Sequence, residues 1–94
     1  MNANIRWSLK KDAYMELDND GNSGMLIDTN TANHCSCNKN AILILKKLKK
    51  GNVNISDLTR EIIKENTVSK SIARKDVSDF INKLKNMKLI DEEN

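Results

Sequence analysis

The chain has 94 residues, of which 38% are hydrophobic and 3% aromatic, so it can form one domain with a modest core but not a two-domain enzyme. Sixteen Lys and Arg against thirteen Asp and Glu give a net charge of +3, which is too small to identify a nucleic-acid-binding protein. No stretch approaches the ~20 apolar residues of a membrane span, and the first residues lack a signal-peptide core. We therefore expect a cytoplasmic protein without membrane contact.

Residues 1–12 show no clear period, and two interpretations are open. Trp7 and Leu9 either pack back on the domain, or the segment is a flexible N-terminal arm. The domain itself is expected over residues 13–90. Residues 91–94 are an acidic tail that we expect to fray.

The segment before residue 38 predicts three short strands, because apolar residues alternate with polar ones between turn signals. The run Asn19–Gly24 is rich in Asn, Asp and Gly, which favour tight turns. A second turn is expected at Asn30–Thr31. The predicted strands cover residues 13–18, 24–29 and 32–37.

From Asn38 the apolar period becomes helical. Asn38, Asn54 and Ser69 are suitable N-cap residues; Asp57 completes a capping box with Asn54, and Gly51 is a helix stop. The predicted helices extend from these caps to about residues 50, 65 and 86. The apolar stripe of the third comprises Ile72, Ala73, Val77, Phe80, Ile81, Leu84 and Met87.

This order predicts an α+β fold in which a three-stranded antiparallel meander packs one face on three following helices. The third strand then lies at an edge of the sheet. It contains neither Lys nor Pro, the residues that usually protect an edge from pairing with another chain. We therefore expect it to accept an added strand. The alternative occupants are the N-terminal arm or a second copy of the chain, which would make a homodimer.

Cys35 and Cys37, with His34 beside them, have the wrong spacing for a zinc site or an unstrained disulfide. We interpret the cysteines as small apolar strand residues in a reducing compartment. No residues form a recognisable catalytic group, phosphate loop or dinucleotide turn. We therefore expect no enzymatic activity, no metal and no cofactor.

One set of segments recurs in the order and spacing of a known family: Leu26–Asp28, Cys37–Ala41, Ile44–Leu45, Leu48, Gly51, Val53–Leu58, Asp76–Ile81, Leu84 and Leu89–Ile90. Together they resemble the PqqD-like peptide chaperones, also called RiPP recognition elements. The resemblance covers about residues 13–90, and three positions depart from the family pattern: Cys37 replaces Leu, Asn40 replaces Thr or Ser, and Lys88 replaces Gly.

The resemblance implies a winged-helix-like module that binds the leader of a ribosomally made precursor peptide and presents it to a maturation enzyme, often a radical SAM protein. The leader would add as a strand beside the third strand and pack against the third helix. Since Cys37 occupies a family Leu position, we expect both cysteines to face the helices. Arg74, Lys75 and Lys85 are candidate electrostatic contacts. The implied leader-binding residues are Asn33, His34, Cys35, Ser36, Cys37, Val77, Phe80, Ile81 and Leu84.

Two other functions remain open at this point. A winged-helix nucleic-acid-binding protein would use the basic residues of the third helix, such as Arg74 and Lys83, although Asp76 and Asp79 on that helix would repel phosphates. A dimerising structural subunit of a larger complex is the third interpretation.

Overall fold

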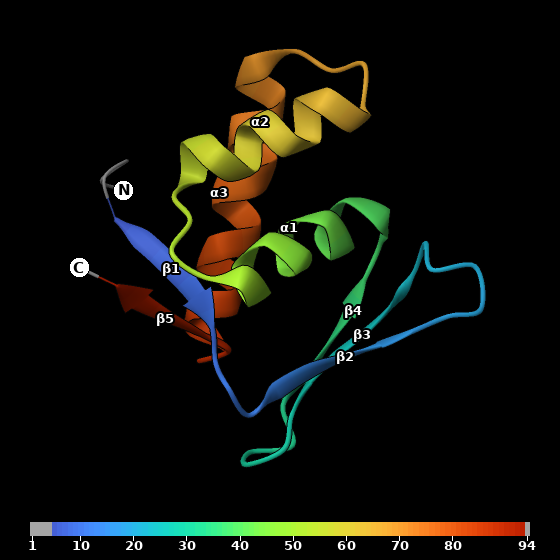
Figure 1. The fold of residues 1–94 in the computed structure, drawn as a ribbon, viewed down its shortest axis with the longest axis vertical. Helices are drawn as coiled ribbons and strands as arrows, with labels where there is room; N and C mark the ends of the chain where they lie inside the picture. The colour runs from blue at the N-terminus through green and yellow to red at the C-terminus, as the bar shows by residue number, and fades with distance from the viewer. Residues whose placement is uncertain (1–4, 94) are drawn as a thin grey trace.

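The structure, a computed structural model, describes residues 5–93 and has the predicted α+β architecture (Figure 1). A three-stranded antiparallel sheet is followed along the chain by three helices, as expected. A second, two-stranded sheet joins the two ends of the chain. The elements are β1 (Arg6–Leu9), β2 (Ala13–Leu17), β3 (Gly24–Asp28), β4 (His34–Cys37), α1 (Lys39–Lys50), α2 (Ile55–Glu65), α3 (Lys70–Asn86) and β5 (Ile90–Glu93).

The two ends of the domain pair with each other, which resolves one open interpretation and corrects another. β1 and β5 are antiparallel, with Trp7 opposite Glu92, and Trp7 also exchanges main-chain hydrogen bonds with Val53 (2.7 and 3.1 Å). The part of the N-terminal segment that the structure describes therefore packs on the domain, and residues 1–4 lie outside the described range. The expectation that residues 91–93 fray is wrong, because strand pairing holds them; residue 94 is not described.

The larger sheet has the order β2–β3–β4. Its last strand is shorter than predicted, because Ala32 has a φ of 61° and so belongs to the turn. The buried carboxylate of Asp28 organises this turn, accepting hydrogen bonds from the Asn30 N–H and the Thr31 hydroxyl, both at 3.0 Å. The third predicted strand therefore begins at His34.

The predicted helix caps are confirmed. The side chain of Asn38 accepts from the N–H of Ala41, and Asn54 and Asp57 form a reciprocal capping box. Ser69 caps α3 in the same way. These bonds satisfy N–H groups that have no partner within the helix. Among the helices of residues 5–93, none combines the length and apolar content that a membrane crossing requires.

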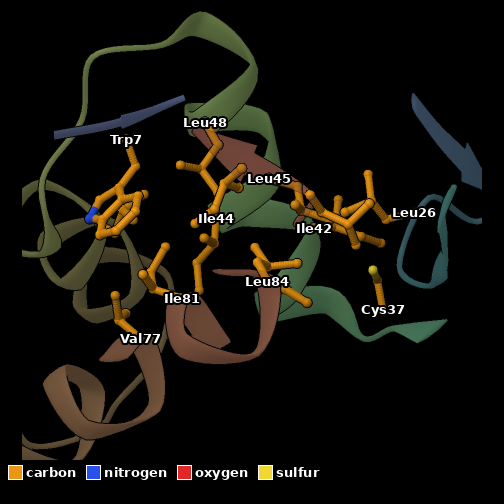
Figure 2. Close-up of a cluster of buried hydrophobic side chains, with 14 of the residues drawn as sticks. Trp7, Leu26, Cys37, Ile42, Ile44, Leu45, Leu48, Val77, Ile81 and Leu84 are labelled. Atoms are coloured by element: carbon orange, nitrogen blue, oxygen red, sulfur yellow. The ribbon is translucent and has the colours of Figure 1, made fainter. Parts of the chain in front are cut away.

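The core lies between the three helices and the inner face of the sheet, with Trp7 closing one end (Figure 2). Leu26, Leu45 and Leu84 are fully buried at its centre. The prediction that Ile72 belongs to the apolar stripe of α3 is wrong, since its side chain is 55% exposed. Ile72 lies in the first turn of α3 and, at 100° per residue, points well away from the direction of Val77 and Leu84.

Candidate functional site

The outer edge of β4 presents unpaired main-chain groups. The oxygen of Asn33 accepts a hydrogen bond from the last residue of β3 (2.9 Å). Hydrogen-bonded and non-hydrogen-bonded pairs alternate in an antiparallel ladder, so Cys35 and Cys37 also direct their main-chain groups at β3. The N–H and C=O groups of His34 and Ser36 therefore point away from the sheet. These four groups are those that an added strand would bond.

No strand in the described part of the chain covers this edge. β4 pairs only with β3. The N-terminal segment, one of the expected alternative occupants, pairs with β5 and Val53 instead. The edge is thus open to another chain.

A cavity of about 220 Å³ lies next to this edge, between β4, the start of α1 and the middle of α3. Its apolar part consists of the buried Ala41 and Ile44 and the half-buried Phe80. The remaining lining residues are polar or charged: Ser36, Asn38, Asn40, Asp76 and Lys83. An apolar floor beside an open strand edge suits an extended peptide, which pairs through its main chain and inserts alternate side chains.

α3 runs antiparallel to β4 along this cavity. At one end the side chain of Asn33, just before β4, donates a hydrogen bond to the oxygen of Met87 at the end of α3 (3.2 Å). Further along, Ser36 and Asn38 share the cavity with Asp76 and Phe80, which lie nearer the start of α3. The charge of Lys83 also acts on the Cys37 thiol, which places Lys83 beside β4.

Most of the apolar residues expected at the site are core residues. The prediction that both cysteines face the helices is confirmed, since Cys35 and Cys37 are buried in the core, and Figure 2 shows Cys37 pointing toward Leu26 and Ile42. Val77, Ile81 and Leu84 are fully buried. Among the α3 residues that were expected to bind the leader, only Phe80 lines the cavity beside β4.

The three expected electrostatic contacts lie away from the cavity. Lys75 pairs with Asp79 on the exposed side of α3 (2.9 Å). Lys85 lies over the ring of Trp7, 5.8 Å from its centroid. Arg74 lines a separate hollow between α2 and α3. None of these three cations therefore lines the cavity beside β4.

Sequence reasoning missed the charged residues that do line the cavity, Asp76 and Lys83. Both follow from the helical period, because they lie four residues before and three residues after Phe80 and so share its side of α3. Asn40, Ala41 and Ile44 also line the cavity. Their position there depends on how α1 crosses β4, which no local sequence pattern predicts.

The Cys37 thiol is poorly suited to redox chemistry. Cys35 and Cys37 are both free, and burial, together with the neighbouring Cys35, raises the pKa of Cys37 from 9.0 to about 11, so the reactive thiolate is scarce at neutral pH. Residues 5–93 contain no cluster of three or more His, Cys, Asp or Glu side chains placed to hold a metal ion. His34 is exposed, with Nδ1 3.5 Å from the oxygen of Ala32.

A larger hollow lies between α1 and α2, with a volume of about 640 Å³. Its rim is largely charged, and two of its charges, Lys47 and Glu61, pair with each other at 3.6 Å. It touches neither β4 nor any other strand edge. We therefore place the candidate site at β4, where main-chain groups and an apolar floor coincide.

The sequence matches no protein-family model and no curated protein sequence. Two solved structures have a similar fold. TbiB1 in complex with the TbiA(beta) leader peptide superposes with a TM-score of 0.76 at 15% identity, over 89% of this chain and 94% of that chain. Lasso peptide synthetase B1 complexed with the leader peptide gives 0.72 at 20% identity, over 89% of this chain and 95% of that one. The chain described here therefore has the fold of these two leader-peptide-bound proteins.

Proposed function

We propose that this protein is a noncatalytic peptide-binding module that captures the leader of a ribosomally made precursor peptide by strand addition to β4. The observation that carries the proposal is the open edge of His34 and Ser36 beside the apolar cavity that Phe80 borders. Two solved structures of the same fold, each in complex with a leader peptide, support it.

The energetics suit a reversible capture step. The outward N–H and C=O groups of His34 and Ser36 provide four main-chain hydrogen bonds, each worth about 1 kcal/mol net. Burying one apolar side chain against Phe80 and Ile44 adds about 2 kcal/mol. These contacts sum to about 6 kcal/mol before the cost of ordering a flexible peptide is subtracted. Alone they correspond to a dissociation constant of about 40 μM or weaker, so micromolar binding requires further apolar contacts from the peptide.

The partner that receives the peptide is proposed to be a maturation enzyme, with a radical SAM protein as one candidate. No residue of this chain is assigned a catalytic role, and the proposal needs no cofactor. The free thiols of Cys35 and Cys37 suit the cytoplasm, the location that the sequence predicts.

The experiment is a titration of the isotope-labelled protein with synthetic peptides that tile the small open reading frames beside its gene, followed by NMR. Binding should shift the amide signals of Asn33–Cys37 and of the Phe80 side of α3. Shifts centred on Lys46–Lys50, or no shift with any peptide, would contradict the proposal.

A proline substitution gives a sharper version of this test. Ser36→Pro removes an outward N–H but no bond to β3, a position that proline tolerates in edge strands. We expect it to weaken peptide binding at least about tenfold. Leu17→Pro is the matched control, because Leu17 lies on the opposite edge strand with its N–H also directed outward. It should leave the affinity unchanged.

Nucleic-acid binding, the rival function, finds less support in the charges of α3. Lys75 is paired with Asp79, and Asp76 adds a further negative charge to the helix. Binding driven by phosphate contacts weakens steeply as salt rises, whereas strand addition should change little. A steep salt dependence of ligand binding would favour the rival.

A further inference from the structure

Three residues of α3, Asp76, Phe80 and Lys83, form one side of the cavity. Their spacing of four and three residues places them in a row along the helix. Asp76 and Lys83 are exposed, and within residues 5–93 neither takes part in a salt bridge, whereas Lys75 and Asp79 on the same helix pair with each other. The cavity therefore has an unpaired negative charge on one side of its aromatic ring and an unpaired positive charge on the other.

The two charges have a fixed order relative to β4. Because α3 runs antiparallel to β4 and Asn33 is bonded to Met87, a chain that follows the direction of β4 passes Lys83 first, beside Cys37 at the end of the strand, and Asp76 after it. Seven residues of helix separate them by about 10 Å along the axis. Four residues of an extended strand cover about 13 Å and return to the same face, so two long side chains of one bound strand, four positions apart, can reach both charges.

We propose that Asp76 and Lys83 determine which peptide segment binds and in which direction. The preferred segment runs antiparallel to β4, with a basic residue first, beside Asp76, and an acidic residue about four positions later, beside Lys83. An apolar residue between them packs on Phe80. Antiparallel pairing is the more stable arrangement per residue and matches the rest of the sheet. This inference rests on the proposed peptide-binding function and adds a charge order to it.

The test is a selection of random peptides, about twelve residues long or roughly 40 Å when extended, displayed on phage and captured by the immobilised protein. Peptides enriched by the wild-type protein should carry Lys or Arg before Asp or Glu, with an apolar residue between. The double variant Asp76→Lys/Lys83→Asp should enrich the opposite order. The control variant Lys75→Asp/Asp79→Lys, which exchanges the charges of the solvent-side pair, should enrich the wild-type order.

A second measurement covers the case in which the double variant does not fold, as judged by circular dichroism. One enriched peptide is synthesised together with an isomer in which its basic and acidic residues are exchanged. Each surface charge pair is weak on its own, but exchange turns two attractions into two repulsions. The isomer should therefore bind the wild-type protein about five- to tenfold more weakly.

The possible outcomes distinguish a failure of the proposed charge order from a failure of the proposed peptide-binding function. Enriched peptides that bind at β4 without any charge order, or with an acidic residue first, would overturn the role of Asp76 and Lys83 and leave peptide binding intact. The same order in the wild-type protein and the double variant would also overturn it. Failure to enrich any peptide would overturn both.

Discussion

The side chain of Asn33 joins the start of β4 to the end of α3, since its Nδ2 donates a hydrogen bond to the main-chain oxygen of Met87 over 3.2 Å. The last carbonyl groups of a helix have no partner within the helix, so this bond satisfies one of them. It also connects the open strand edge with the helix that forms the other wall of the cavity. This bond adds a polar link between β4 and α3 to the packing of their buried residues in the shared core.

Asn33→Ala should lower the free energy of unfolding by about 1 kcal/mol, the net value of such a bond. Urea denaturation followed by far-UV circular dichroism measures it. Asn22→Ala is the control, because Asn22 is an exposed turn residue whose side chain is in no hydrogen bond within residues 5–93. Equal effects of the two substitutions would mean that the Asn33–Met87 bond contributes nothing to stability.

The end of α3 holds a second testable feature. Lys88 has a φ of 58°, its N–H bonds to the oxygen of Lys85, and the N–H of Leu89 bonds to the oxygen of Leu84, both at 3.0 Å. This is the Schellman arrangement, whose left-handed residue is usually glycine. The PqqD-like pattern that the sequence resembles has Gly at this position, whereas this chain places a residue with a Cβ in the left-handed conformation.

Lys88→Gly should therefore raise the free energy of unfolding by about 0.5 to 1 kcal/mol, because glycine adopts positive φ without a steric cost. The urea midpoint would move upward with an unchanged slope. Lys88→Ala removes the same charge but retains a Cβ, and it should give no gain. If both variants behave alike, the charge of Lys88 and not its backbone conformation determines the effect.

Local signals explain why most of the fold was readable in the sequence. The caps at Asn38, Asn54 and Ser69 each bond to a backbone group three residues away, so residue type and spacing are sufficient to recognise them. β1 and β5 carry no such signal. They have four residues each, and the partner of Trp7 lies at the other end of the chain, at Glu92. Only the folded core brings them together.

The candidate site could be predicted in part, because its open edge also has a local signal in the sequence. The lack of Lys and Pro in residues 32–37 is a property of one strand, and it correctly identified an open edge. The choice of helix residues was less accurate, because a helical stripe does not tell a buried position such as Leu84 from a border position such as Phe80. That distinction depends on how far α1 and β4 cover α3.

Burial of Cys37 makes the stability depend on pH in the alkaline range. The pKa of its thiol is about 11 in the folded protein and 9.0 when exposed, so the folded state holds the proton more tightly. The stabilisation that the protonated Cys37 thiol gives the folded state is fully present below pH 9, and it is lost as the pH rises through 11. We expect the free energy of unfolding to fall by about 2 kcal/mol over this interval.

Urea midpoints measured at several pH values test this, with Cys37→Ala as the control. The variant should be less stable at neutral pH, because it loses buried volume, but its midpoint should fall less between pH 9 and 11. Parallel curves for the two proteins would assign the pH dependence to other groups. Alkylation of the wild-type thiols should likewise be slow until the protein unfolds.

Trp7 anchors the N-terminal strand and has a buried N–H group without a hydrogen-bond partner in the described part of the chain. Its side chain is 2% exposed, and the unpaired atom is Nε1. An unpaired buried N–H costs about 1 to 3 kcal/mol, which offsets part of what the ring gains by burial. Trp7→Ala should lower the free energy of unfolding by about 3 to 5 kcal/mol.

Trp7→Phe keeps a ring beneath Lys85 and removes the unpaired N–H, so we expect a loss of less than about 1.5 kcal/mol in spite of the smaller volume. Both variants are followed by far-UV circular dichroism, because Trp7 is the only tryptophan. Tyr14→Ala, at an aromatic residue that is 44% exposed, serves as the control and should cost less than about 1 kcal/mol. If Trp7→Ala cost no more than Tyr14→Ala, β1 would not be held on the domain in solution, and residues 1–12 would behave as the flexible arm that the sequence left open.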